Sequence, residues 1–390
     1  MRVLAITKIF PNSLEPLSSP FNRQQFAALA ELCDLTVIEA IPWFPLASLT
    51  GKPPRAAKLA ELPRRETVAG IETVYMRQLY VPMIGTPIAL PLYVASLAPY
   101  RALVHDHDVV LGTWAYPDGC AATVMARALK KPVVVKVHGS DVNIVAKMPS
   151  ARAVMRHVLP QVTAIASVSR ALSDELALGI GVPREKIHLV PNGVDTTIFF
   201  PRDRSAMRKK LGLPDDRPLV LFVGRLEPQK GVEELLLAFE DVLAARPDAM
   251  LALVGTGVLD ERVKGLKSKW PEGALHAPGP RPLTEVAEWM GAADLFTLPS
   301  WNEGTPNVVL EALASGRPAV GTRVGGIPDV LKSADAGILV SVKDARNLAH
   351  GLLEGLARKW DLSKILAAGP CSWNESAKQL HAVLEGAISR

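Results

Sequence analysis

Cysteine is scarce in this sequence, which has 390 residues and only three cysteines. No two of them have the spacing of a metal site or a redox pair, and an odd count argues against a disulfide framework. The sequence therefore predicts a protein of a reducing compartment, the cytoplasm. Aromatic residues make up only 5% of the chain, which argues against the stacking surfaces of nucleic-acid-binding proteins. The cysteines are Cys33, Cys120 and Cys371.

Long apolar runs and phosphate-binding signatures are also missing. No uninterrupted apolar stretch reaches the roughly 18 residues of a transmembrane helix. The first residues, Met1–Thr7, are too short a run for a signal peptide and predict a buried strand. The chain contains no Walker A motif and no dense run of Lys or Arg, yet its formal net charge is +5. This balance favours an anionic ligand or an anionic surface.

Short β-rich runs alternate with helical patterns along the whole chain, and 48% of the residues are hydrophobic. Continuous apolar strands separated by helices predict parallel sheets covered on both faces. The predicted strands of a first sheet are Val3–Ile6, Leu35–Ile38, Val109–Gly112, Val133–Val137 and Ile165–Val168, and those of a second are Leu219–Val223, Met250–Val254, Leu295–Leu298, Pro318–Gly321 and Ile338–Val340. The predicted helices include Phe21–Leu32, Ala151–Pro160, Val232–Arg246, Leu283–Gly291 and Asn307–Ser315.

A turn-rich break, Pro191-Asn-Gly-Val-Asp195 followed by Pro201, separates the two sets of strands. We place the domain boundary near residue 198. The predicted fold is α/β, with two Rossmann-like doubly wound domains and a ligand-binding cleft between them.

The segment Ile41–Gly85 is predicted to be an irregular, proline-rich excursion packed on the first domain. Its basic residues lie beside apolar ones such as Trp43, Phe44, Tyr75 and Tyr80, so an alternative interpretation is a patch that docks on an anionic membrane surface.

The most informative stretch is Glu303-Gly-Thr-Pro-Asn-Val-Val-Leu-Glu-Ala312. Thr305 is predicted to cap a helix that has Pro306 at its first position. The amides of Asn307 and Val308 would then point out of the positive helix end, which suits a phosphate. Glu303 and Glu311 could hold opposite ends of one elongated ligand, and a nucleotide sugar has that form.

A second motif, Gly224-Arg-Leu-Glu-Pro-Gln-Lys-Gly231, joins a predicted strand to a predicted helix. Ligands gather at such turns in parallel sheets. Arg225 and Lys230 could bracket a diphosphate. The alternative is that both are ordinary surface cations.

Two weaker signals also follow predicted strands. Val254-Gly-Thr-Gly257 lacks the third glycine of the dinucleotide fingerprint and predicts a tight turn. His138-Gly-Ser-Asp141 places a histidine where it could contact a sugar or act as an acid or base, although a structural role is the alternative. Asp106-His-Asp108 precedes its strand, so we predict a solvated loop there and not a metal site.

Together these motifs resemble family-4 retaining glycosyltransferases with the GT-B fold, over essentially the whole chain. Supporting motifs are Pro191-Asn-Gly-Val-Asp195, Gly325-Gly-Ile-Pro-Asp329 and Ser372-Trp373. The resemblance implies an acceptor-binding domain at 1–198, a nucleotide-sugar domain at 199–370 and a helix at 371–390 that returns to the first domain.

The resemblance also implies roles for single residues. Arg225 and Lys230 would neutralise the donor diphosphate without a metal or other cofactor. Glu311 would bind the ribose hydroxyls, and Glu303 would bind the donor sugar near His138. The remaining donor-side residues implied are Gly224, Gly279, Arg281, Gly304, Thr305, Pro306, Asn307 and Val308, and the acceptor-side residues are Ser18, Ser19 and Asp141.

The loop Pro11–Pro20 departs from the family, because it lacks the glycines found there in many relatives. Asp329 departs as well, at a position where glutamate is commoner. Ser18 and Ser19 would substitute for the missing glycines by hydrogen bonding.

From the family we expect transfer of a hexose to a glycan, lipid-linked or small acceptor in bacterial polysaccharide or glycolipid synthesis. Retention would follow a front-side mechanism, because no carboxylate is an obvious nucleophile. The enzyme would be cytoplasmic, with peripheral attachment to the inner membrane face as an option, and would have no nucleic-acid partner. The alternatives are a non-catalytic nucleotide-sugar-binding protein and a GT-B epimerase or phosphorylase.

Overall fold

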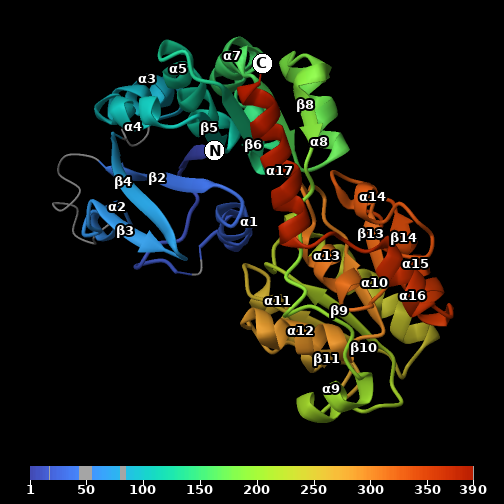
Figure 1. The fold of residues 1–390 in the computed structure, drawn as a ribbon. Coiled ribbons are helices and arrows are strands. Elements are labelled where there is room, and N and C mark those ends of the chain that lie inside the picture. The colour runs from blue at the N-terminus through green and yellow to red at the C-terminus, as the bar shows by residue number, and fades with distance from the viewer. Residues whose placement is uncertain (17, 44–54, 80–84, 390) are drawn as a thin grey trace. The chain divides into compact units, whose positions relative to one another are not determined.

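The structure, a computed structural model, describes residues 1–16, 18–43, 55–79 and 85–389. The chain forms two compact units, one made of Met1–Asn192 with Trp373–Arg390 and the other of Gly193–Ser372. Each unit contains a sheet covered by helices (Figure 1). The chain leaves the first unit at Asn192, a few residues before the boundary placed at 198 from the sequence.

The sheet of the first unit has the order β3-β4-β2-β1-β5-β6-β7-β8. All neighbours are parallel except β3 and β4. Its strands are β1 (Arg2–Thr7), β2 (Asp34–Trp43), β3 (Arg65–Val68), β4 (Ile71–Leu79), β5 (Val109–Thr113), β6 (Val133–Val137), β7 (Ala164–Ser167) and β8 (Ile187–Leu189).

Alternate side chains of this sheet enter cores on its two faces, as expected for a strand period of two. Val3 and Ala5 pack with α1 and α17, whereas Leu4 and Ile6 pack with α3, α5 and α7. The helices of this unit are α1 (Pro20–Ala30), α2 (Arg55–Leu59), α3 (Gly85–Leu97), α4 (Arg101–Asp106), α5 (Cys120–Ala128), α6 (Ser140–Asn143), α7 (Pro149–Val158), α8 (Arg170–Asp174) and α17 (Trp373–Ile388).

The last helix, α17, confirms the expected return of the chain to the first domain. It packs against α1 and against β5, β6 and β7 (Figure 1). Trp373, Leu380 and Leu384 are buried in the same core as Phe26 and Leu29 of α1. Burial of several large apolar side chains, each stabilising by about 1.5–3 kcal/mol, fixes this helix to the unit.

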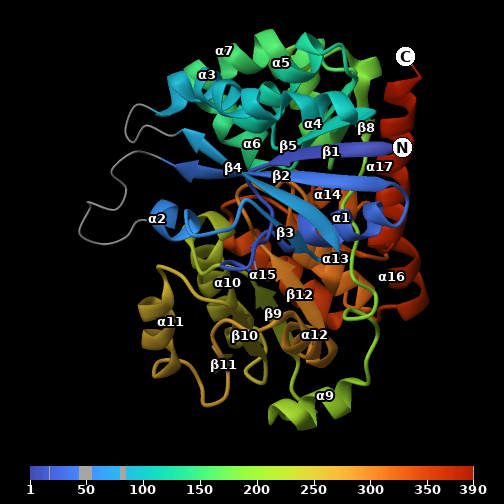
Figure 2. The same ribbon diagram turned by 60° about the vertical axis from the view of Figure 1, so that its left-hand side comes forward.

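The predicted irregular excursion at 41–85 is wrong for most of its described residues. β2 continues to Trp43, and β3 and β4 form a hairpin that adds to its edge (Figure 2). Ala69 and Gly70, both with positive φ, form the two-residue turn that such hairpins favour. Of the predicted membrane patch, Tyr75 is buried, while Phe44 and Tyr80 lie outside the described residues.

The second unit has an all-parallel sheet in the order β11-β10-β9-β12-β13-β14. Three of its strands have the predicted bounds, because their apolar runs end at turn residues. The strands are β9 (Leu219–Val223), β10 (Met250–Val254), β11 (Leu275–His276), β12 (Leu295–Leu298), β13 (Ala319–Thr322) and β14 (Gly337–Val340). The helices are α9 (Arg204–Leu211), α10 (Val232–Ala245), α11 (Asp260–Lys267), α12 (Leu283–Ala292), α13 (Asn307–Ala314), α14 (Ile327–Val330), α15 (Ala345–Ala357) and α16 (Leu362–Ala368).

A buried lysine ties distant parts of the first unit together. Lys136 of β6 is fully buried, and its Nζ donates to Gln25 of α1 and to Asn192 Oδ1 at 3.3 Å. Gln25 Nε2 donates to Ser376 Oγ of α17 at 3.0 Å, and that hydroxyl donates to the Pro191 carbonyl at 2.6 Å. A buried amine needs such acceptors, so this network fixes α1 and α17 relative to the sheet.

Lys136→Met tests the state of this amine. Burial lowers the pKa of Lys136 from 10.5 to about 7, so between these values the unfolded chain holds a proton that the folded chain has released. The free energy of unfolding should therefore rise with pH in this window, by up to about 1.4 kcal/mol per pH unit from this residue, and the variant should lose that contribution. Urea unfolding at several pH values measures the slopes. If Lys136→Met showed the same dependence of unfolding free energy on pH as wild type, the burial of this amine would be contradicted. Lys209→Met, on the exposed face of α9, is the control.

Candidate functional site

The order of the second sheet reverses between β9 and β12, which neighbour each other although β10 and β11 intervene in sequence. Ligands of doubly wound folds bind at the carboxyl ends of the strands beside such a point. The loops that follow these two strands are residues 224–231 and 299–306. Both contain the motifs singled out in the sequence.

Glycines let the loops of neighbouring strands touch. Gly224 N donates to the Val254 carbonyl at 3.0 Å, and Gly255 N donates to the Gly279 carbonyl at 3.1 Å. A Cβ on Gly255 would stand 1.8 Å from the Gly224 carbonyl oxygen. These positions also have strongly positive φ, which favours glycine. The weak Gly-x-Gly signal is thus a packing requirement between loops.

The loop after β12 is held in the same way from both sides. Trp301 N donates to the Gln229 carbonyl at 2.9 Å, and a Cβ on Gly231 would stand 2.0 Å from the Pro299 carbonyl oxygen. A Cβ on Gly325 would stand 1.8 Å from the Glu303 carbonyl oxygen. The motifs at 224–231, 254–257, 303–312 and 325–329 therefore meet along one edge of the sheet.

An ion pair joins the two central loops. Lys230 Nζ lies 2.7 Å from Glu303 Oε1, and Ser300 Oγ donates to the same oxygen at 2.7 Å. The side chain of Glu303 is only 10% exposed, so this pair is worth more than a surface pair. Arg225 is mostly exposed and pairs with Glu227 at 2.9 Å. Lys230 is thus fixed in position, whereas Arg225 reaches toward solvent.

The start of α13 differs from the predicted cap. Pro306, with φ −80° and ψ 77°, occupies the N-cap position, and no side chain caps the helix. Thr305 instead contributes its carbonyl, which accepts from Asn307 N at 3.0 Å. The prediction of Thr305 as the cap with Pro306 at the first helical position is wrong, because the turn places the helix start one residue later. The Asn307 amide is engaged locally and does not point out freely.

Glu311 lies about one turn into α13, on a half-buried position. Desolvation by burial raises the pKa of its carboxyl to about 7. No hydrogen-bond donor to this carboxylate is found among the described residues. A desolvated carboxyl without donors is costly when charged, so the site favours a ligand that supplies hydroxyl donors.

Gly279 and Arg281 follow β11 on a neighbouring loop. Gly279 has φ 83°, and its carbonyl accepts from Gly255, which attaches this loop to the others. Arg281 donates to the Pro278 carbonyl at 2.9 Å and lies 3.6 Å from Glu285. Arg281 is exposed and is held by its own loop.

In the first unit, His138 follows β6 between two aromatic rings. Its ring centroid lies 5.1 Å from that of Phe21 and 6.4 Å from that of Trp114. Both ring nitrogens are buried and have no hydrogen-bond partner among the described residues. Burial, together with the nearby Lys136, lowers the pKa of His138 well below 6.5. The imidazole is neutral and lacks partners for both nitrogens.

Asp141 is fully buried, and its carboxylate accepts from four backbone amides. The amides of Ala115, His138 and Gly139 donate at 2.9, 3.1 and 2.7 Å, and that of Val142 at 3.2 Å. Burial raises its pKa, and the amide donors oppose that rise. In this geometry Asp141 fixes the loop that carries His138.

The sequence reasoning missed a polar cluster beside His138. Lys8, directly after β1, lies 3.7 Å from Asp118 and 5.0 Å from the Trp114 ring centroid. Asp118 is fully buried and accepts from the Tyr93 hydroxyl at 3.0 Å, and burial raises its pKa to about 6. β1 and β5 are neighbours where the order of this sheet reverses. A cation directly after the first strand was the available signal.

Of the predicted acceptor-side serines, Ser18 donates to the Phe10 carbonyl at 3.2 Å and so closes its own loop. Ser19 precedes α1 with φ 47°, a left-handed conformation, and its side chain does not cap the helix. Both serines therefore lie on the loop after β1 that leads to α1.

Among the described residues, no three His, Cys, Asp or Glu side chains gather where they could hold a metal ion. Asp108 accepts from Arg2 N at 2.7 Å at the amino end of β5, and Asp106 ends α4. None of the described helices has both the length and the apolar character needed to cross a bilayer.

Comparison with known proteins decides the family. The family model described as "Glycosyl transferases group 1" matches residues 203–367, and the model described as "Glycosyltransferase Family 4" matches residues 27–198. TuaC, a glycosyltransferase assigned to teichuronic acid biosynthesis in Bacillus subtilis (strain 168), is 30% identical over 373 residues, covering 90% of this chain and 88% of TuaC. The chain belongs to glycosyltransferase family 4. This confirms the family and the enzyme class expected from the motifs.

Further relatives and solved structures agree. A GDP-mannose-dependent mannosyltransferase of Corynebacterium glutamicum, which acts on a monoacylated phosphatidylinositol monomannoside, is 29% identical over 80% of this chain and 86% of its own length. Anabaena HepE in complex with UDP superposes with a TM-score of 0.73 at 18% identity, covering 99% of this glycosyltransferase and 100% of HepE. Sucrose-phosphate synthase from Thermosynechococcus elongatus superposes with a TM-score of 0.68 at 20% identity, covering 100% of this chain and 97% of the synthase. These likenesses confirm the GT-B fold.

The loop contact at Gly231 can be tested against a matched glycine. Gly231 and Gly212 both have φ 69°, but a Cβ at Gly212 would meet nothing within 4 Å. In each alanine variant the free energy of unfolding should fall by about 1 kcal/mol, because alanine disfavours the left-handed conformation. It should fall clearly further in Gly231→Ala, because the new Cβ collides with the Pro299 carbonyl. Urea unfolding of both variants measures the difference, and equal losses would show that the two loops are not in contact.

Proposed function

We propose that this glycosyltransferase moves a sugar from a nucleotide-sugar donor to a glycan, lipid-linked or small acceptor, with retention of configuration and without a metal ion. The observation that carries the proposal is the arrangement at the carboxyl edge of the second sheet. Lys230 is paired there with Glu303 across the two central loops, and Glu311 presents a carboxyl without donors from the described residues. Cations and carboxyls on one edge suit a ligand with both phosphates and hydroxyls.

The relatives support this class of substrate. The Corynebacterium glutamicum relative is named for GDP-mannose and a phosphatidylinositol acceptor, and TuaC for teichuronic acid synthesis. HepE structures contain UDP and UDP-glucose. We infer a role in bacterial polysaccharide or glycolipid synthesis, at the inner membrane face if the acceptor is lipid-linked.

The donor would lie along the loops of the second unit. Arg225 and Lys230 would contact its diphosphate, with Gly224 allowing close approach of the backbone. Glu311 would accept from the ribose hydroxyls and Glu303 from a sugar hydroxyl. The segment Gly304 to Val308 would lie along the sugar and phosphate, and Gly279 and Arg281 near the base.

The chemistry would depend on charge stabilisation. As the bond between the sugar and the diphosphate breaks, negative charge develops on the leaving phosphate, and Lys230 is already held in place to stabilise it. The acceptor hydroxyl would attack from the same face while its proton passes to that phosphate. Asp118, the carboxylate in the aromatic cluster of the first unit, is fully buried between Tyr93 and Lys8 and presents no open face for a double displacement.

The acceptor would bind to the first unit. The neutral imidazole of His138, with both nitrogens lacking a protein partner in the described structure, could hydrogen-bond a substrate hydroxyl. Ser18 and Ser19 lie on the loop after β1, and Asp141 fixes the His138 loop. Contact with an anionic membrane remains part of the proposal, since the chain is basic overall.

A transfer assay with a panel of nucleotide sugars in EDTA tests the function. We expect turnover with one donor, an unchanged anomeric configuration by NMR, and a loss of kcat of about hundredfold in Lys230→Met, because the leaving-group charge loses its stabilisation. Lys209→Met on the exposed face of α9 is the charge-matched control. Turnover that requires a metal, an inverted product, or full kcat in Lys230→Met would each overturn the corresponding part of the proposal.

Donor affinity should depend on pH through Glu311. The pKa of about 7 keeps this carboxyl largely protonated below neutrality, whereas acceptance of ribose hydroxyls requires the ionised form. Affinity should therefore improve by about tenfold from pH 6 to pH 8. A nucleotide sugar is the suitable ligand, because its phosphates do not titrate in this range.

Glu311→Gln gives the control for that titration. The amide keeps the size of the side chain but cannot ionise, so affinity should be weak and nearly independent of pH. Calorimetric titration of both proteins provides the comparison. A pH dependence in Glu311→Gln equal to that of wild type would assign it to another group.

A further inference from the structure

A second charged region lies at the opposite edge of the second sheet. A cavity of about 420 Å³ opens there, lined by residues that directly precede strands: Pro218 before β9, Asp294 before β12 and Pro318 before β13. It is therefore at the amino ends of the strands, whereas the donor loops follow their carboxyl ends. Five arginines line it: Arg202, Arg204, Arg246, Arg317 and Arg358.

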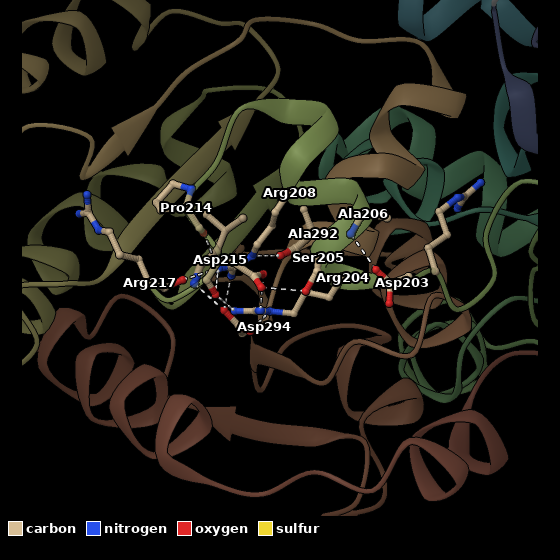
Figure 3. Close-up of polar contacts among 12 residues, drawn as sticks. Asp203, Arg204, Ser205, Ala206, Arg208, Pro214, Asp215, Arg217, Ala292 and Asp294 are labelled. Atoms are coloured by element: carbon tan, nitrogen blue, oxygen red, sulfur yellow. Dashed lines mark hydrogen bonds and ion pairs between the residues drawn. The ribbon is translucent and has the colours of Figure 1, made fainter.

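Part of this positive charge is neutralised within the protein. Asp294 lies between two guanidinium groups, 2.7 Å from Arg204 Nε and 2.7 Å from Arg208 Nη2 (Figure 3). Arg204 also pairs with Asp215 at 3.0 Å, and Arg208 donates to the Ala292 carbonyl at 2.9 Å. Outside this group, Arg246 pairs with its neighbour Asp248 at 3.2 Å. The charges of these three arginines are balanced by those of Asp215, Asp248 and Asp294, so the paired groups carry no net charge.

Three arginines of the lining are not neutralised in this way. Arg202 lies over the Phe200 ring at 4.1 Å and donates to the Ala287 carbonyl at 3.4 Å, and no carboxylate of the described part of the chain pairs with it. Arg358 lies over the Trp360 ring at 4.5 Å, and no carboxylate pairs with it among the described residues. Of the two lining carboxylates, Asp294 is already paired, so Arg202, Arg317 and Arg358 are left with Asp216.

Arg317 gives the most direct sign of a missing partner. Its Nη2 donates to the Arg202 carbonyl at 3.3 Å, but its Nε is buried and has no acceptor within the described structure. Burial lowers the pKa of this guanidinium, so its charged form is poorly solvated. An unpaired buried donor is destabilising, more so when it is charged, and an anion in the cavity would remove that cost.

Nearby helix ends explain why cations are favoured here, but they do not supply hydrogen-bond acceptors for the guanidinium groups. Arg246 and Arg358 directly follow α10 and α15, and Arg317 follows the end of α13. Helix C-termini carry partial negative charge, which favours cations nearby. A dipole does not provide an acceptor for each N–H, however, and planar guanidinium groups match phosphate oxygens in a bidentate way.

We propose that this cavity binds a small polyphosphate anion, inorganic or carried on a nucleotide, through Arg202, Arg317 and Arg358. Every residue that lines the cavity belongs to the second unit, as the donor loops do. The two sites are nevertheless separate, because the cavity lies at the amino ends of the strands and the donor loops follow their carboxyl ends. A volume of this size lies within the usual range for small-ligand pockets.

Pyrophosphate binding, followed by hydrogen–deuterium exchange, tests the site and locates it. Pyrophosphate should protect residues 355–365, and Arg202→Gln/Arg358→Gln should abolish this protection and weaken binding there by about tenfold or more. Both arginines are partly exposed, so the double variant should fold. The matched control is Lys209→Gln/Lys359→Gln, which removes the same charge from exposed positions outside the lining.

The same experiment separates the two edges and the two sources of phosphate. Lys230→Met should leave the protection of 355–365 intact. Comparison of pyrophosphate with UDP and GDP shows whether the anion is preferred free or on a nucleotide. Protection confined to 224–231 and 299–308, protection of 355–365 that persists in the arginine double variant, or no protection at millimolar pyrophosphate would each overturn the proposal.

Discussion

The close approach of neighbouring loops at the carboxyl edge of the second sheet is the constraint on which the site depends. Parallel strands lie under 5 Å apart, so the loops that leave β9, β10 and β12 must pass each other at backbone contact distance. Gly255 and Gly231 make this possible, because a Cβ at either would overlap a carbonyl oxygen of the adjacent loop. Lys230 and Glu303 then meet across the gap. Their position is therefore a consequence of backbone packing and not of flexible side chains.

Five of the six strands of the second sheet could be predicted closely from sequence, since each is a short apolar run bounded by a turn residue, but the two-residue strand β11 was not predicted. The hairpin β3–β4 was not predicted either. Glu72 and Arg77 interrupt its apolar pattern, and its order arises from pairing with β2 and from burial of Val74, Tyr75 and Met76. Such tertiary support overrides weak local propensity. The start of α13 failed for a related reason, because local capping rules do not include the contacts that fix the Glu303–Pro306 turn.

Lys230, Glu303 and Glu311 could be singled out from the sequence because each lies in a recognisable motif, and their roles in binding and catalysis stay predictions. Contacts between distant segments, the Lys230–Glu303 ion pair among them, could not be predicted. Lys8 and Asp118 follow β1 and β5, which become neighbours only through the strand order of the first sheet. The role of Asp141 was also hidden, because a carboxylate beside a histidine suggests chemistry, whereas the structure shows it accepting four backbone amides.

The two edges of the second sheet place opposite demands on their side chains. Helices that follow the strands begin at the carboxyl edge, where the positive ends of their dipoles favour an anion, so one fixed lysine and an exposed arginine add to an existing field. Helices end at the amino edge, where the same dipoles disfavour an anion. Binding an anion at this edge therefore requires several arginines whose N–H donors are available. Where a carboxylate is present, it occupies those donors, as Asp294 does by pairing with Arg204 and Arg208. The arginines that lack such a carboxylate are therefore the informative ones at this edge.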